Sequence, residues 1–133
     1  MKRIGAYRVA KQAVGATANR PSTTVGQDVP DARLIVFRIA PGQAVSPHHS
    51  ASTVILTVLA GAGVVSGADG EWAVDQGDVV AYEPNEVHGL RAVDRELVVL
   101  ATSTPRPGTR VVLHRATAGG MPLRWSCERR YGA

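Results

Sequence analysis

Three histidines in two clusters carry most of the chemistry that this sequence supports. His48 and His49 are adjacent, and His88 follows in the segment P-N-E-V-H-G at 84–89. Imidazole nitrogens bind divalent transition metals, and they also accept and donate protons near neutral pH. The fourth histidine, His114, lies outside both clusters, and we expect it to be structural.

Turn residues flank both clusters and predict that each histidine lies beside a strand. Gly77-Asp78 begins a short apolar segment and Pro84-Asn85 ends it, so that His88 opens the next strand. Pro41-Gly42 stands before the His48-His49 pair, and a strongly apolar segment follows the pair. Whether the two clusters meet in space decides what they can bind.

The composition and the spacing of turns predict an all-β protein. Hydrophobic residues make up 44% of the chain but aromatic residues only 5%, so the core would consist mostly of Val, Leu, Ile and Ala. Gly and Pro separate short apolar segments, and no segment keeps the helical period over three turns. The predicted strands lie at 34–39, 53–59, 64–66, 71–74, 79–83, 87–91, 96–102 and 111–113, with shorter candidates at 7–10 and 23–26. Such spacing is typical of a sandwich or a closed barrel.

Two glycines follow the most apolar of these strands. Gly61-Ala62-Gly63 resembles part of a dinucleotide-binding loop, but that loop must open a helix, whereas Val64-Val65 follows directly here. We therefore predict a hairpin turn at 61–63. A second hairpin is predicted at Asp69-Gly70.

The charge pattern and the cysteine count exclude several classes of protein. The formal net charge is +4, but residues 69–96 hold eight acidic side chains against two arginines, and the excess positive charge lies near the ends of the chain. Without a dense basic stripe and aromatic stacking partners, we expect no nucleic-acid binding. Cys127 is the single cysteine, which leaves no internal disulfide. No signal-peptide pattern or membrane-length apolar run is present, so we predict a cytoplasmic protein without membrane contact.

The order of these features resembles the cupin family. Gly42, His48 and Gly61 match its first motif in part, and G-D-V-V-A-Y-E-P-N-E-V-H-G at 77–89 matches its second motif closely. The resemblance spans residues 34–107. It implies a cupin-type double-stranded β-helix, which is a small jelly-roll β-barrel, and a homodimer formed through N-terminal strands.

The resemblance also implies a divalent metal inside the barrel, held by two histidines and a glutamate from the first motif and one histidine from the second. By position, the first histidine falls on His48 and the second on Ser50. The glutamate position holds Val54, and the second motif places its histidine on His88. The anionic ligand of the family is therefore absent, and one histidine is missing or displaced to His49.

Strand alternation decides whether His49 can take part. Neighbouring residues of a strand point to opposite faces, so His48 and His49 share a face only if a bulge intervenes at 47–50. The expected metal ligands are His48 and His88, joined by His49 if that bulge is present. The metal would be Zn, Fe, Mn, Ni or Cu.

The strand before His88 offers one further candidate. Tyr82 and Glu83 must face opposite ways, and a carboxylate inside an apolar barrel is costly unless it is paired. We therefore expect Tyr82 to face inward and Glu83 outward. Tyr82 would then orient a substrate and is a candidate for a catalytic role, although the sequence identifies no catalytic residue. The expected ligand-binding residues are Ser50, Val54 and Tyr82.

Two functions follow from this pattern. In the first, the protein binds a divalent metal and a small organic ligand in the barrel and resembles metal-dependent cupin oxygenases or isomerases. In the second, it is a non-catalytic module that binds a small molecule without a metal. We expect an N-terminal arm with candidate edge strands at 1–32, the barrel at 33–115 and a C-terminal tail at 116–133.

Overall fold

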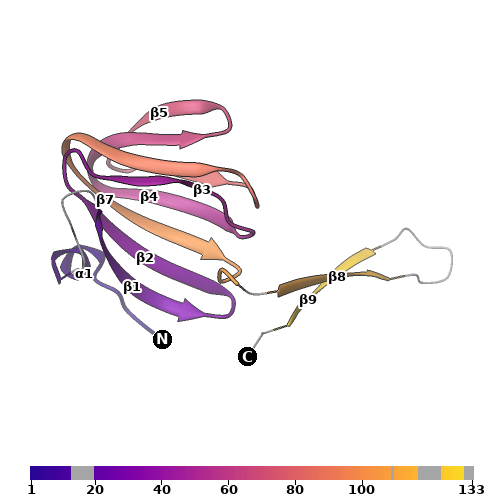
Figure 1. Ribbon diagram of the computed structural model, residues 1–133. Helices are drawn as coiled ribbons and strands as arrows, with labels where there is room; N and C mark the ends of the chain where they lie inside the picture. Colours follow the sequence, from indigo (N-terminus) through magenta and orange to yellow (C-terminus); the bar gives the residue numbers. More distant parts are fainter. Residues whose placement is uncertain (13–19, 109, 117–123, 131–133) are drawn as a thin grey trace.

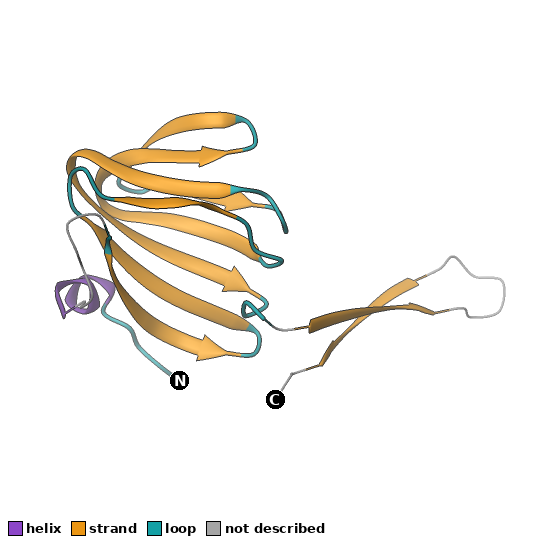
Figure 2. Ribbon diagram, viewed as in Figure 1, coloured by secondary structure: helices purple, strands orange, loops and turns teal. Residues whose placement is uncertain are grey.

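A computed structural model describes residues 1–12, 20–108, 110–116 and 124–130 of the protein (Figures 1 and 2). Strands dominate these residues, and α1 (Ala6–Gln12) is the one helix in the described ranges. The strands are β1 (Ser22–Val29), β2 (Ala32–Ile39), β3 (Ala44–His48), β4 (Thr53–Gly67), β5 (Gly70–Asp75), β6 (Val79–Tyr82), β7 (His88–Thr104), β8 (Arg110–Ala116) and β9 (Arg124–Arg130).

The main sheet folds into two layers that face each other. The longest strands, β4 and β7, run through both layers and connect them. One layer has the order β1, β2, the second half of β7, the first half of β4, and β6. The other has the order β3, the first half of β7, the second half of β4, and β5. All of these strand pairs are antiparallel. The predicted all-β jelly-roll barrel is confirmed.

The hairpin turn predicted at 61–63 is wrong, because β4 continues through both glycines. Gly61 has a φ of +77°, and the pairing of β4 with β7 shifts register between Val58 and Ala60 and again between Gly61 and Gly63. Such bulges let a strand bend without ending. The two strands predicted at 87–91 and 96–102 likewise form one strand, β7. It stays paired with β4 on both sides of these register shifts and passes with β4 from one layer into the other.

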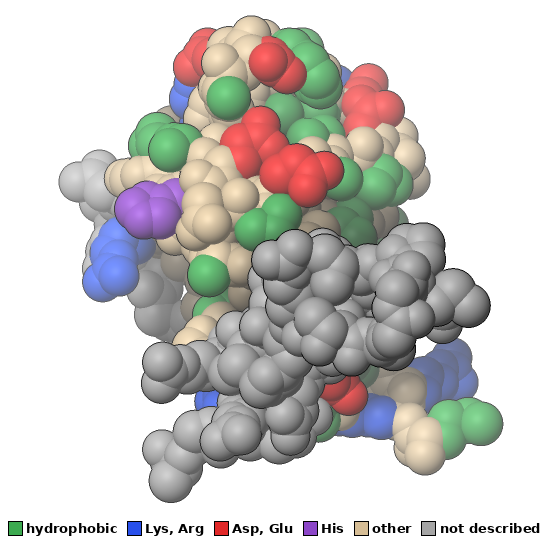
Figure 3. Space-filling view, turned by 90° about the vertical axis from the view of Figure 1, so that its right-hand side faces the viewer, with side chains coloured by type: hydrophobic (Ala, Val, Ile, Leu, Met, Phe, Trp, Pro, Cys, Tyr) green, Lys and Arg blue, Asp and Glu red, His purple; other side chains and the backbone are tan. Residues whose placement is uncertain are grey.

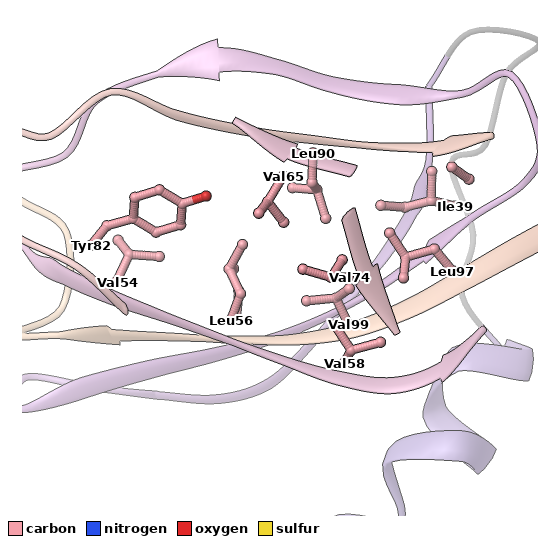
Figure 4. Packing of buried hydrophobic residues seen from close by; sticks show 12 residues of the cluster. Ile39, Val54, Leu56, Val58, Val65, Val74, Tyr82, Leu90, Leu97 and Val99 are labelled. Atoms are coloured by element: carbon pink, nitrogen blue, oxygen red, sulfur yellow. The ribbon is translucent and has the colours of Figure 1, made fainter. Parts of the chain in front are cut away.

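The core lies between the two layers and is mainly aliphatic, as the composition predicts (Figure 4). Alternate residues of a strand point to the same face, so Val54, Leu56 and Val58 of β4 all point inward and are buried. They pack against inward residues of β7, among them Leu97 and Val99. Burial of each such side chain contributes about 1.5–3 kcal/mol.

The outer face of the β2–β7 layer is covered by α1, although the sequence predicts a short strand at 7–10. That prediction is wrong. Ala10 packs with Val36 and Val98, which point away from the core, and Ala6 and Val9 extend this small cluster. The Tyr7 hydroxyl donates to the Leu59 carbonyl oxygen. A second apolar surface on the outside of the sheet therefore selects a helix where local preference leaves the choice open.

The two ends of the chain differ in how they join the barrel. Strand β1, from the expected N-terminal arm, is an edge strand of the main sheet and, within the described part of the chain, pairs with β2 alone. Strand β8 pairs with β9 in a separate hairpin that extends away from the barrel (Figure 1). No helix in the described ranges is long and apolar enough to cross a membrane. Homodimer formation and the expected domain boundaries stay predictions.

Replacement of Gly61 by alanine tests the close approach of β4 to β7. An added Cβ would lie 1.7 Å from the Glu96 carbonyl oxygen, at a backbone φ of +77° that non-glycine residues rarely adopt. We expect Gly61→Ala to lower the free energy of unfolding by at least about 2 kcal/mol in urea denaturation. Gly42→Ala is the matched control, because Gly42 has a φ of +82° but no atom within 4 Å of the added Cβ. Equal losses in the two variants would mean that the steric contact is unimportant.

Candidate metal and ligand site

A row of side chains crosses the main sheet at one end of the barrel. The pairing register joins Tyr82 of β6 to Val54 of β4, Val54 to Ser103 of β7, Ser103 to Arg33 of β2, and Arg33 to Asp28 of β1. The next rows inward are apolar and consist of Leu56, Ala101 and Ile35, then Val58, Val99 and Phe37. Figure 3 views this end of the molecule and shows histidine, acidic and hydrophobic side chains at its surface. The barrel therefore has an apolar interior and a polar end.

The opposite layer brings two of the predicted histidines together at the same end. His48 closes β3 and His88 opens β7, and the two are direct partners in the β3–β7 ladder. Their rings meet edge to face, with centroids 4.3 Å apart. The ladder shifts register between Val45 and His48. A bulge therefore exists, but it precedes His48 rather than lying between His48 and His49.

Each of these imidazoles is oriented by a main-chain oxygen. His48 Nδ1 lies 2.9 Å from the Ser46 carbonyl oxygen, and His88 Nδ1 lies 3.0 Å from the Glu86 carbonyl oxygen. A carbonyl oxygen only accepts, so each neutral ring carries its proton on Nδ1 and keeps a free lone pair on Nε2. The same arrangement orients histidines that bind metals.

Tyr82 supports His88 from the side. Tyr82 is 4% exposed while Glu83 is exposed, so the predicted orientation of the two residues is confirmed. The Tyr82 ring lies 5.0 Å from the His88 ring between centroids, and its hydroxyl donates to the Ser66 carbonyl oxygen at 3.0 Å. Burial, and then the negative charge of Glu86, raise the pKa of Tyr82. Its hydroxyl therefore stays protonated and is engaged with the main chain.

The loop that carries Ser50 is tied to the turn before His88. The Asn85 amide donates to the Ser50 carbonyl oxygen at 2.6 Å, and the Ser52 amide donates to the Ser50 hydroxyl oxygen at 3.1 Å. Asn85 has a φ of +67°, which the P-N turn requires and which asparagine tolerates. The two sequence motifs are therefore joined directly by a hydrogen bond.

The two histidines, Ser50 and the inward side chains of the sheet line a cavity of about 280 Å³. That volume is near the lower limit for small-molecule sites, about 300 Å³. Its apolar wall consists of Ile35, Phe37, Val45, Val54, Leu56, Leu90, Ala101 and Pro107, and its polar wall of Arg33, His48, His49, Ser50, His88 and Ser103. Of the expected ligand-binding residues, Ser50 and Val54 line the cavity and Tyr82 contacts His88. Their role in binding stays a prediction.

The donor set suits a divalent metal in part. Two neutral imidazoles with free Nε2 atoms match zinc, copper, nickel or iron, but zinc sites in proteins generally use three or more protein ligands. Within the described residues, no three or more His, Cys, Asp or Glu side chains are grouped to hold a metal. His48 and His88 therefore fit an ion that completes its coordination with water or a ligand. Participation of His49 stays a prediction.

Sequence reasoning missed the positive charge at the other side of the cavity. Arg33 lies in the cavity wall and pairs with Asp28, which also pairs with Arg106. The adjacent Arg106 holds the pKa of Asp28 below its usual range; desolvation opposes this shift and Arg33 supports it. No motif marks Arg33. Only its position in a strand that alternates inward Arg33, Ile35 and Phe37 could have indicated it.

Comparison with known proteins agrees with this architecture. A family model described as Cupin domain matches residues 35–103. A protein with a double-stranded β-helix domain from Klebsiella pneumoniae has 20% identity and a TM-score of 0.66, covering 73% of this chain and 87% of its own. An RmlC-like cupin from Desulfovibrio desulfuricans has 25% identity and a TM-score of 0.63, covering 71% of this chain and 91% of its own.

A third structure, a predicted oxalate decarboxylase from Thermotoga maritima, has 22% identity and a TM-score of 0.61, and covers 64% of this chain and 80% of its own. No curated protein matches the chain. At these identities the structural similarity establishes the fold and leaves the ligand open.

The environment of His88 predicts a pH dependence of stability. Burial lowers the pKa of His88 below 6.5, the positive charge that His48 can carry adds to this, and the bond to the Glu86 carbonyl opposes it. As pH falls below 6.5, the unfolded chain takes up the proton first, so folding stability is lost down to the folded-state pKa.

NMR titration of chelator-treated protein, with His88→Gln to assign the signal, should give His88 a pKa below 6.5. The variant should also lose less stability than the wild type between neutral and acidic pH. A His88 pKa at or above the ordinary value would contradict this account.

Proposed function

This chain belongs to the cupin family, and on that premise we propose that its barrel binds a small organic ligand beside a divalent metal ion held by His48 and His88. One observation carries the proposal. In both histidines Nδ1 is engaged with a main-chain oxygen, which leaves Nε2 of each ring free, and both histidines line one cavity.

The residues around the pair have separable roles in this proposal. The apolar wall, including Ile35 and Leu56, contacts the body of the ligand and excludes water from it. Tyr82 holds the His88 ring in place, because its own hydroxyl is occupied by the Ser66 carbonyl. When bound, the metal ion would supply Lewis acidity toward a ligand oxygen. The Ser50 hydroxyl accepts from the Ser52 amide and can still donate to a ligand.

Val54 sets the charge of the proposed site. It is buried, lines the cavity and stands where the family places its glutamate. Two neutral imidazoles leave the charge of a divalent ion uncompensated, so the ion would be held more weakly than in a site with a carboxylate.

Val54 also favours the second candidate function, a metal-free binding module. Without a carboxylate, the two imidazoles can serve as hydrogen-bond acceptors through Nε2 for a ligand hydroxyl or amide. The lowered pKa of His88 keeps its ring neutral and able to accept at neutral pH. Metal content separates the two functions.

Protein purified without chelator should contain close to one divalent ion per chain by elemental mass spectrometry. His88→Ala and His48→Ala should each lower this content at least tenfold, since one imidazole alone is a weak ligand. His49→Ala measures whether the exposed neighbour adds a third ligand. Sub-stoichiometric metal in wild type and His88→Ala alike would favour the metal-free module.

Restoring a carboxylate at residue 54 gives a second, opposite test. Val54→Glu should destabilise the metal-free protein by several kcal/mol, because it buries a charge near an apolar wall. Added Zn²⁺ should restore that stability, with affinity at least about tenfold above wild type, or about 1.4 kcal/mol. Val54→Gln is the control of equal size without charge. If zinc shifts the melting temperature of neither variant, residue 54 does not face a metal site.

A further inference from the structure

We propose that the ligand of this cavity is a small monocarboxylate with an apolar body, whose carboxylate binds Arg33 and Ser103. This rests on the proposed function in one respect, namely that the cavity binds a small organic molecule. It does not depend on a bound metal.

Arg33 and Ser103 are direct partners in the β2–β7 ladder. Both belong to the cavity wall. Both side chains face the interior of the barrel. Ile35 and Ala101, two residues away on the same faces of these strands, are also partners and also line the cavity. Paired side chains on one face of a sheet are about 5 Å apart at Cβ. A guanidinium and a hydroxyl at that spacing can donate together to the two oxygens of one carboxylate.

The ion pairs at this end leave positive charge available. Arg33 lies 3.3 and 3.5 Å from the Asp28 oxygens through Nε and Nη2, which are long contacts. Arg106 is closer to the same carboxylate, at 2.5 and 3.2 Å. One carboxylate therefore faces two guanidinium groups. The two bonds to Asp28 use Nε and Nη2 of Arg33, and Nη1 takes part in neither.

The exposure of Arg33 suits a ligand contact. Its side chain is 27% exposed, so it is neither freely solvated nor sealed in the core. In such partly desolvated surroundings a charge-assisted, bidentate bond to a carboxylate is stronger than in water. Arg33 and Arg106 together carry one more charge than Asp28, and a single excess charge in this group matches a monoanion better than a phosphate or a dicarboxylate.

The remaining wall defines the other part of the ligand. Ile35 and Leu56 lie in the row next to Arg33, and Phe37 lies one row deeper. They offer no hydrogen-bonding side chain, so the body of the ligand is apolar. Arg33 is two strands from Val54, about 10 Å at a strand spacing of about 4.8 Å. A ligand of modest length anchored at Arg33 would therefore reach the side of the cavity formed by Val54.

The test uses acid and amide pairs with the same body: phenylacetate with phenylacetamide, and hexanoate with hexanamide. Binding to the full chain is measured by calorimetry and by amide NMR shifts of Ile35 and Ala101. Chelator-treated protein is used, so that a metal cannot supply the preference for the acid. We expect at least one acid to shift the cavity residues and to bind at least tenfold more tightly than its amide.

Three variants assign that preference. Arg33→Met should abolish the difference between acid and amide while the amide still binds. Arg38→Met is the matched control, because Arg38 lies on the same strand, pairs with Glu96 at 2.9 Å at the surface, and carries the same charge. Asp28→Asn should act oppositely and tighten acid binding severalfold, because it releases both guanidinium groups.

The outcomes separate this inference from the proposed function. Acid and amide binding equally to the wild type, or an acid preference that survives in Arg33→Met, would overturn the carboxylate assignment and leave a ligand cavity in place. If no acid or amide shifts the cavity residues, the carboxylate assignment fails together with small-molecule binding. Loss of the preference in Arg38→Met would show a general charge effect and would also overturn it.

Discussion

The close contact between β4 and β7 at Gly61 and Gly63 is the constraint on which the barrel depends. At these two residues the backbones approach so closely that a Cβ would meet the carbonyl oxygens of Glu96 and Arg91 at 1.7 and 2.4 Å. The register shifts there, where residues 93–96 of β7 have no partner on β4, let both strands leave one layer and enter the other. Because β7 crosses between the layers, it lines the cavity from both sides, with His88 and Leu90 on one wall and Ala101 and Ser103 on the other.

The register set by that contact also separates polar from apolar residues. Val99 and Ala101 line up with Val58 and Leu56 in the interior, and Ser103 then falls beside Val54 at the polar end. The two histidines enter from the opposite layer at this end, where water and carbonyl oxygens can satisfy them. A histidine one or two rows deeper would face only aliphatic side chains, and its desolvation would have no compensation.

The sequence predicts those features of the fold and site that depend on local pattern. The turns at 77–78 and 84–85 locate His88. Strand alternation, together with the cost of burying a carboxylate, assigns Tyr82 to the interior and Glu83 to the surface. The merging of 53–59 with 64–66 could not be predicted, because two glycines suit a bulge as well as a turn and only the partner strand decides between them. Likewise α1 depends on an apolar patch formed by Val36 and Val98, which are far from it in the chain. Arg33 shows the same limit, since it meets Ser103 only through the β2–β7 register.

The hydrogen bonds that orient the two imidazoles have a consequence for sequence divergence. Each ring bonds to the main-chain oxygen of the residue two positions earlier, Ser46 for His48 and Glu86 for His88. In many metal proteins a carboxylate side chain orients the imidazole, and mutation of that carboxylate disturbs the orientation and the tautomer of the histidine. Here any residue at 46 or 86 presents the same oxygen. Ring orientation is thus inherited with the backbone, so related chains can vary both side chains and keep the same tautomers.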